Sequence, residues 1–234
     1  MAVDGVVLVH GAVHGVWCWE PVRPLLRARS VAVDLPGRGT RPAHGRAVTI
    51  EMAVDAVLSD ADEAGFDRFV LVGHSLGGVT ITETANRAPD RVARAVYLSA
   101  LAPKPGQGFF DASSRHDGAR EDIDPTGAQP LMPEAVAHRL FAGDLDEAAF
   151  AAVYARFVPE PNGLLLARIS GYSPQVPTTY IRCVRDVILP LALADGMVGN
   201  LPQPDVRDLD ADHDAMLTSP TALAALLDEI AASA

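Results

Sequence analysis

The amino-acid sequence predicts an α/β fold with a mostly parallel central sheet flanked by helices. Short runs of β-branched and apolar residues recur along the chain and are apolar on both faces, as buried parallel strands require. Segments with helical spacing separate these runs, and strands that alternate with helices in short steps form parallel sheets with right-handed crossovers. One run, residues 69–72, ends directly in Gly73-His74-Ser75-Leu76-Gly77, a pattern typical of a sharp turn from strand to helix.

Each expected element depends on a local signal. Thr49 is the expected N-cap of one helix and Gly65 its end, while Pro21 suits the first turn of another. The last helix has apolar residues at i, i+3, i+4 and i+7, namely Leu223, Leu226, Leu227 and Ile230. We expect strands over residues 5–9, 31–33, 69–72, 92–98 and 178–184, and a weak strand over 205–209. We expect the other helices over residues 21–29, 49–64, 76–87, 133–143 and 146–157.

The serine of the strand-to-helix turn, Ser75, is the predicted nucleophile. Such a turn holds the serine in a strained conformation, so the residues two before and two after it must be nearly free of side chain. Both positions, 73 and 77, are glycine. The turn should lift the serine hydroxyl out of the sheet to the N-terminus of the next helix, where free N–H groups favour negative charge. A glycine-rich turn with an incidental serine is the alternative interpretation.

A nucleophilic serine needs a general base and an acid that orients the base. Asp186 directly follows the strand at 178–184, and His213 lies in the loop before the last helix, so the chain order is serine, acid, histidine. We therefore predict His213 as the base and Asp186 as the acid. A helix N-cap is the alternative for Asp186, and a surface histidine is the alternative for His213. Rivals for the acid, none of which follows so clear a strand, are Asp195, Asp205, Asp208 and Asp210.

The loop after the first strand supplies half of the predicted oxyanion hole. Hydrolases of this type use two backbone N–H donors, one from the residue after the nucleophile and one from a glycine-containing loop after an earlier strand. Leu76 and Ala12 are those residues. His10 is expected to brace this loop, whereas His14 stays open between bracing the loop and bordering the substrate pocket.

For two pairs of charged residues we expect structural or solvent-facing roles rather than catalytic ones. Asp34 and Arg38 are expected to form a structural pair that fixes the turn-rich segment around them, with substrate contact as the alternative. Asp212 and Asp214 flank the predicted base, and we expect them to shape the loop or face solvent.

The pattern changes after Ser99. Residues 103–177 lose strand signals, accumulate proline and glycine, and contain two helical stretches. An insertion that leaves the carboxyl end of a central strand would lie over Ser75 as a cap. We therefore divide the chain into a core of residues 1–102 and 177–234 and a largely helical cap of residues 103–176. Most apolar cap side chains should pack within the cap. The side chains predicted to bind substrate, two of them from the first loop, are His14, Trp17, Phe109, Phe110, Leu140, Phe141 and Tyr154.

Composition limits the partners and the location. The net charge of −11 disfavours nucleic acid and anionic membrane surfaces, and no apolar run approaches the length of a membrane span. We expect a soluble, cytoplasmic protein with a small-molecule substrate, whose only macromolecular partner would be a second copy in a homodimer. Cys18 and Cys183 lack metal-ligand spacing, so we expect free thiols, no metal and no cofactor. Only one of the 19 basic residues is lysine, an arginine bias that suggests a GC-rich bacterial genome.

The motifs together resemble the α/β-hydrolase superfamily, and more narrowly the plant methyl esterase and hydroxynitrile lyase family with its bacterial relatives. The resemblance spans nearly the whole chain and is carried by LVHGAVHGVWCWE at 8–20, GHSLGG at 73–78 and ADHDAML at 211–217. It implies an α/β-hydrolase fold with a cap inserted after a central strand. In the lyases a lysine follows the catalytic histidine and a threonine stands in the oxyanion loop. Asp214 and Ala12 occupy these positions here, so lyase activity is not expected.

The resulting hypothesis is a carboxylesterase-type serine hydrolase that cleaves a small or medium, largely apolar ester through an acyl-enzyme; a methyl ester is one candidate. The first alternative is a biosynthetic enzyme that uses the same triad for cyclisation, elimination or demethylation of a pathway intermediate. The second is a ligand receptor on a hydrolase fold. Sequence leaves both open.

Overall fold

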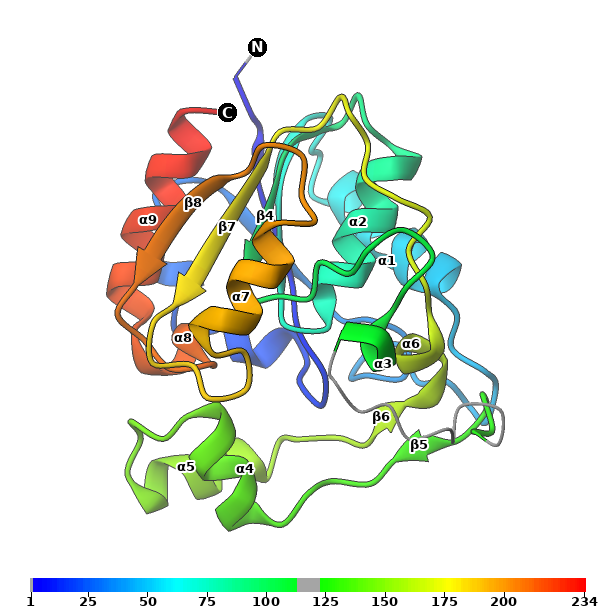
Figure 1. Ribbon diagram of the computed structural model, residues 1–234, viewed down its shortest axis with the longest axis vertical. Coiled ribbons are helices and arrows are strands. Elements are labelled where there is room, and N and C mark those ends of the chain that lie inside the picture. Colours follow the sequence, from blue (N-terminus) through cyan, green and yellow to red (C-terminus); the bar gives the residue numbers. More distant parts are fainter. Residues whose placement is uncertain (1, 113–122) are drawn as a thin grey trace.

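A six-stranded parallel sheet forms the centre of the molecule (Figure 1). The computed structural model describes residues 2–112 and 123–234. The strand order is β2-β1-β3-β4-β7-β8. The strands are β1 Gly5–Val9, β2 Ser30–Val33, β3 Phe69–His74, β4 Val92–Leu98, β7 Thr178–Cys183 and β8 Asp205–Leu209. The predicted α/β-hydrolase fold is confirmed, including the weak last strand.

Helices cover both faces of the sheet. One face packs against α1 Ile50–Glu63, α2 Gly77–Arg87 and α7 Leu191–Val198, and the other against α8 Ala215–Thr218 and α9 Pro220–Ala232. Thr49 caps α1 through a 3.3 Å hydrogen bond from the Met52 N–H, as the sequence predicts. The central strands β1, β3 and β4 are therefore buried on both sides, which explains why they are largely apolar runs, whereas the edge strand β8 is partly exposed.

Side chains of β1 show how the two cores divide. Val7 and Val9 point into the core beneath α1 and α2, whereas Val6 and Leu8 point into the core beneath α9. This alternation is the two-residue period of a strand. Because both cores are fully apolar at β1, the carboxyl end of this strand provides a rigid base for the loop that follows it.

The helix predicted over residues 21–29 does not form. In its place is one 3₁₀ turn, Arg23–Leu25, after which the backbone becomes extended at Leu26. Another 3₁₀ turn, Val16–Trp19, precedes it. Pro24 has no N–H, so it cannot donate the hydrogen bond that a helix beginning at Pro21 needs there. The single proline at position 21 suits a helix start, but the second one prevents the helix from continuing.

The segment between β4 and β7 carries the two expected helices, α4 Glu134–Phe141 and α5 Glu147–Tyr154. It also contains elements that the sequence did not predict: the short helices α3 Phe109–Ala112 and α6 Asn162–Leu166, and a short antiparallel pair of β5 Ala128–Gln129 with β6 Glu160–Pro161. In Figure 1 the arrowheads of β7 and β8 point toward α4 and α5. Residues 113–122 of this segment lie outside the described residues, and its definition as a cap over 103–176 stays a prediction.

A small aromatic core lies within this segment. Phe141, Phe150 and Phe157 are buried together and contact Val13 of the first loop. The predicted cap helices therefore pack on each other and on the loop after β1 at the same time.

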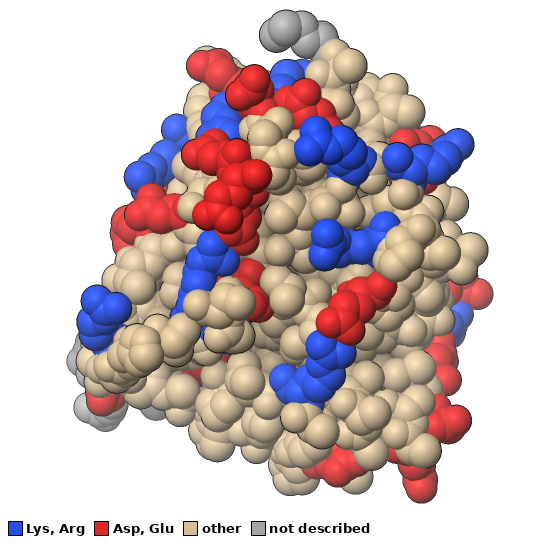
Figure 2. Space-filling model, turned by 180° about the vertical axis from the view of Figure 1, so that it is seen from behind, with Lys and Arg blue, Asp and Glu red and all other residues tan. Residues whose placement is uncertain are grey.

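Charges on the surface are mixed. Figure 2 shows basic residues interspersed with acidic residues over the face seen from behind. Several of them form exposed ion pairs, such as Arg207 with Glu229 and Arg156 with Glu20. Among residues 2–112 and 123–234, no helix has both the length and the apolar character needed to cross a bilayer.

Candidate active site

Ser75 occupies the turn between β3 and α2 with a backbone φ of 51°. Non-glycine residues rarely adopt this left-handed conformation, which costs on the order of 1–3 kcal/mol. Both flanking glycines are sterically required. A Cβ at Gly73 would lie 2.8 Å from Ile81 Cγ2, and one at Gly77 would lie 2.6 Å from the His10 carbonyl oxygen. The turn therefore has the geometry that the G-x-S-x-G pattern predicts.

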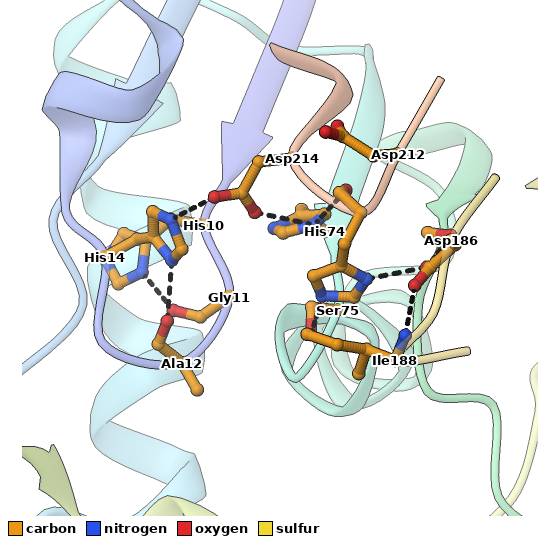
Figure 3. Close-up of polar contacts among 12 residues, drawn as sticks. His10, Gly11, Ala12, His14, His74, Ser75, Asp186, Ile188, Asp212 and Asp214 are labelled. Carbon is orange, nitrogen blue, oxygen red and sulfur yellow. Dashed lines mark hydrogen bonds and ion pairs between the residues drawn. The ribbon is translucent and has the colours of Figure 1, made fainter. Parts of the chain in front are cut away.

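Two further side chains complete a hydrogen-bonded chain with Ser75. His213 Nε2 lies 3.0 Å from Ser75 Oγ, and His213 Nδ1 lies 2.7 Å from Asp186 Oδ2. The other oxygen of Asp186 accepts the backbone N–H groups of Ile188 at 2.7 Å and Leu189 at 2.9 Å (Figure 3). Asp186 thus also holds the turn after β7, but it is not the N-cap of a helix, because α7 begins at Leu191 with Pro190 as its N-cap. The loop between β8 and α8 carries His213 to this position.

The protonation states of this chain follow from its contacts. Burial raises the pKa of Asp186, but the His213 ring, the Ser99 hydroxyl and the Leu189 N–H outweigh burial and lower it to about 2. Burial lowers the pKa of His213, but the Asp186 carboxylate and its hydrogen bond outweigh burial and raise it above its ordinary value. Asp186 is therefore an anion at neutral pH, and it makes the His213 ring a stronger base.

The loop after β1 lies directly beside the serine. A Cβ on Gly11 would lie 2.8 Å from Ser75 Cβ and 3.0 Å from His74 Nδ1, so only glycine fits there without displacement. Within the described part of the chain, neither the Ala12 nor the Leu76 N–H donates a hydrogen bond to a protein acceptor. Both donors are thus available for an oxyanion, as their prediction requires, and their catalytic role stays a prediction.

Histidine side chains hold this loop. The Leu35 N–H donates to His10 Nε2 at 3.2 Å, so the proton of the His10 ring is on Nδ1, which donates to the Gly11 carbonyl at 2.8 Å. Burial and then the Arg38 charge lower the pKa of His10 well below its ordinary value, which keeps the ring neutral. His10 therefore braces the loop, as the sequence predicts.

Sequence reasoning missed a buried network on the other side of the base. His14 Nε2 lies 2.9 Å from Asp214 Oδ2, and His14 Nδ1 donates to the Ala12 carbonyl at 2.7 Å. His74 Nε2 donates to the His213 carbonyl at 3.0 Å and lies 3.7 Å from Asp214 Oδ1. In Figure 3 Asp214 lies between His14 and His74. The expectation that Asp214 could face solvent is wrong, because its carboxylate is fully buried.

Asp212 is buried as well, and it shapes the loop. Its carboxylate accepts the Asp144 N–H at 3.1 Å and the Thr218 hydroxyl at 2.6 Å. Burial raises the pKa of this carboxyl above its ordinary value. The expected loop-shaping role is confirmed for Asp212, and solvent exposure is not.

The prediction that Asp34 pairs with Arg38 is wrong, because each of the two side chains has other partners. Asp34 accepts the N–H groups of Val16 at 2.9 Å and Thr40 at 3.1 Å, and so joins two loops by backbone contacts. Arg38 instead forms a buried ion pair with Glu160 of the segment between β4 and β7. Nothing in the local sequence around residue 38 indicates a partner 122 residues away.

The side chains predicted to bind substrate occupy different surroundings. The Phe141 ring lies 5.8 Å from the His213 ring, and Trp17 stacks on His14 at 5.3 Å. His14 is fully buried with both ring nitrogens bonded to protein atoms, so a substrate bond would have to replace one of them. The remaining four have other contacts. Tyr154 donates to the Met132 carbonyl, Leu140 packs on the aromatic core, and Phe109 and Phe110 line a surface hollow beside α6. Their contact with substrate stays a prediction.

One group of side chains in the described residues could in principle hold a metal ion. Potential ligand atoms of His74, His213 and Asp214 lie within 4.8 Å of one another. However, both ring nitrogens of His213 bond to Asp186 and Ser75, so a metal ion on His213 would break the hydrogen-bonded chain. His213 in this arrangement therefore serves the hydrogen-bonded chain and not a metal site.

This arrangement can carry out acyl transfer. A serine hydroxyl 3.0 Å from an imidazole whose far nitrogen is held by an aspartate can lose its proton as it attacks a carbonyl carbon. Two free N–H groups beside it can bind the oxygen that becomes negative.

Comparisons with known proteins agree with this geometry. Residues 6–226 match the model of the alpha/beta hydrolase family. The chain is 32% identical to Methylesterase 3 from Arabidopsis thaliana, over 97% of this chain and 95% of that protein. Its structure superposes on that of the methylesterase MES16 from Arabidopsis with a TM-score of 0.81 and 26% identity, covering 98% of this chain and 99% of the other. A pyrethroid hydrolase from Sphingobium faniae gives a TM-score of 0.82 at 25% identity, over 97% of each chain.

Proposed function

The chain belongs to the alpha/beta hydrolase family and is a carboxylesterase-type serine hydrolase, and from this premise we propose that it cleaves methyl esters of small or medium, largely apolar carboxylic acids. The observation that carries the proposal is the hydrogen-bonded chain from Ser75 through His213 to Asp186, at 3.0 and 2.7 Å. Names of relatives such as Methylesterase 3 and methyl jasmonate esterase 1, from Vitis vinifera, support the methyl ester.

In the proposed mechanism His213 takes the proton of Ser75 as Ser75 Oγ attacks the ester carbonyl. The Ala12 and Leu76 N–H groups bind the oxyanion, and His213 then gives the proton to the departing methanol. Water attacks the acyl-enzyme with the same base, releasing the acid and restoring the Ser75 hydroxyl. Asp186 keeps the His213 ring oriented and stabilises its positive charge in both halves.

The apolar surroundings of His213 support a substrate ester whose carboxylic acid part is apolar. The Phe141 ring lies near His213, and Phe141 packs with Phe157 and Val13. Such walls bind aromatic and aliphatic groups by burying apolar surface, worth about 25 cal/mol per Å². The net charge of −11 supports a small-molecule substrate over nucleic acid. The cytoplasmic location, the bacterial source and the homodimer stay predictions, and the source has no support from the plant proteins named above.

The test measures alcohol release from methyl, ethyl and butyl esters of the same aromatic and aliphatic acids. We expect the methyl esters to react fastest and Ser75→Ala to abolish turnover. A small fluorophosphonate should add one mass increment to the wild-type protein and none to Ser75→Ala. Full ester hydrolysis by Ser75→Ala would disprove the assignment, and a preference for butyl esters would disprove the methyl ester alone.

A further inference from the structure

We propose that Glu160 and Arg38 are positioning residues for the oxyanion hole, and that Glu160 couples the segment between β4 and β7 to the catalytic loop. This inference rests on the proposed function, in which the Ala12 N–H binds the oxyanion. Neither side chain needs to touch substrate. Both act on the backbone of the loop, at residues 12–14.

Three contacts tie the pair to the loop. Glu160 Oε2 accepts the Val13 N–H at 2.8 Å, and the same oxygen pairs with Arg38 Nη2. Arg38 Nε donates to the His14 carbonyl at 2.8 Å. One buried ion pair therefore binds an N–H and a carbonyl of adjacent residues in the loop.

These contacts determine the orientation of the peptide that follows Ala12. The Val13 N–H and the Ala12 carbonyl belong to one planar trans peptide and point in opposite directions. Glu160 holds the N–H end, while His14 Nδ1 holds the carbonyl end at 2.7 Å. With both ends held, the plane cannot rotate without breaking a buried hydrogen bond, and the neighbouring Ala12 N–H keeps its direction.

The loop needs such support because its backbone is strained. Val13 has a φ of 60°, a left-handed conformation that a β-branched residue rarely adopts. Contacts from outside must hold a residue in this state. Glu160 supplies the contact to the Val13 N–H, and the Val158 N–H donates to the Val13 carbonyl at 3.0 Å. Both come from the segment between β4 and β7, so displacement of this segment would release the loop.

Burial of the pair indicates that stability is not its main contribution. Arg38 is 2% exposed and Glu160 is 3% exposed. Arg38 Nη1 and Glu160 Oε1 have no hydrogen-bond partner among the described residues, and both side chains line a cavity of about 10 Å³ beside Gly11 and Leu76. A buried ion pair often gives no more stability than an apolar pair of similar volume. What an apolar pair could not provide is the acceptor for Val13 and the donor for His14.

The experiment compares an ester with its thionoester, in which sulfur replaces the carbonyl oxygen. Sulfur accepts hydrogen bonds weakly, so thionoester turnover depends little on the oxyanion donors. The double variant Arg38→Met with Glu160→Met removes both charges and should fold, as thermal melting would show. Loss of a direct oxyanion donor costs about 10²–10³ in kcat, so we expect a positioning loss of about 10- to 100-fold on the ester, with the thionoester changed less than about threefold.

Two matched variants separate the effects. Arg38→Met with Glu160→Gln restores an uncharged acceptor for the Val13 N–H and should recover most of the ester kcat. Glu20→Met with Arg156→Met removes another ion pair between the same two parts of the chain, which does not bond to residues 11–14, and should leave the kcat ratio of the two esters unchanged.

An equal fall on both esters, or no fall on either, would overturn the proposal while leaving the proposed function intact. Ester turnover that survives Ser75→Ala would overturn the proposed function itself, and the positioning role with it.

Discussion

Ser99 Oγ donates a 2.6 Å hydrogen bond to Oδ2 of Asp186, the same carboxylate oxygen that faces the catalytic histidine. Ser99 is fully buried, lies at the end of β4 and has a φ of 40°. A serine in this strained conformation thus supports the acid from a neighbouring strand. The hydroxyl helps to keep the Asp186 pKa low, which keeps the carboxylate charged.

We expect Ser99→Ala to remove one hydrogen bond that supports the Asp186 carboxylate, while the carboxylate itself stays in place. Loss of a hydrogen bond to a charged group should lower the free energy of unfolding by about 1.5–3 kcal/mol at neutral pH, measured by urea denaturation. The pKa of Asp186 is lowered on folding, so its stabilising effect is present above its unfolded value and is lost as pH falls toward about 2. With Ser99→Ala the folded pKa rises, so this loss should be smaller and should be complete at a higher pH.

Ser99→Gly is the matched control, because glycine removes the hydroxyl but accepts the left-handed backbone. Both variants should lose kcat to the same extent, and the glycine variant should be the more stable. Wild-type kcat in both would show that the Ser99 hydroxyl has no effect on the acid.

The pH dependence of kcat/KM should report His213. The base must be neutral, so activity should rise as pH increases through its pKa, with a midpoint above 6.5, because Asp186 raises that pKa despite burial. The contribution of His213 to the free energy of unfolding has the opposite pH dependence. It is complete below pH 6.5 and is lost as pH rises through the pKa of the folded state. Asp186→Asn should move the midpoint down and lower kcat by about 10³–10⁴. A midpoint that Asp186→Asn leaves in place would contradict the assignment.

Much of the site could be predicted from sequence because its signals are local. Ser75 lies in a turn that requires Gly73 and Gly77, and Asp186 follows a clear strand. The residues next to each of them in the sequence therefore indicate its role. The order of the elements then determines which strand ends meet at one edge of the sheet, and so brings His213 to Ser75.

The parts that could not be predicted are side-chain pairs between distant segments. Arg38 pairs with Glu160, and His14 pairs with Asp214 across 200 residues. A charged residue in a turn cannot be told from a solvated one until its partner is known, so solvent exposure stayed one of the two expectations for Asp214. Burial of these groups depends on how the segment between β4 and β7 packs on the first loop, and no periodicity in the chain encodes that packing.

Asp214→Lys should fail to convert the enzyme to a lyase, even though it places a lysine after His213. The Asp214 side chain is fully buried against His14 and His74, so a lysine there would be a buried cation without a partner. We expect the free energy of unfolding to fall by about 3–5 kcal/mol. Asp90→Lys makes the same charge change at an exposed position and should alter it by less than about 0.5 kcal/mol. Cyanohydrin cleavage by a stable Asp214→Lys protein would contradict this prediction.

Gly11→Ala should act mainly on kcat, with a smaller effect on the free energy of unfolding. The added methyl group would meet Ser75 Cβ at 2.8 Å and His74 Nδ1 at 3.0 Å, which must displace the serine or the loop that carries the Ala12 N–H. A displacement of this size at the reacting atoms can cost about 10² in kcat. Gly196→Ala in α7 is the matched control, because its new methyl group meets no atom within 4 Å. Its free energy of unfolding should rise by about 0.5–1 kcal/mol, and its kcat should be unchanged. Steady-state kinetics and urea denaturation of the two variants test the contrast. Equal kcat values for Gly11→Ala and the wild type would show that the loop can yield without disturbing the serine.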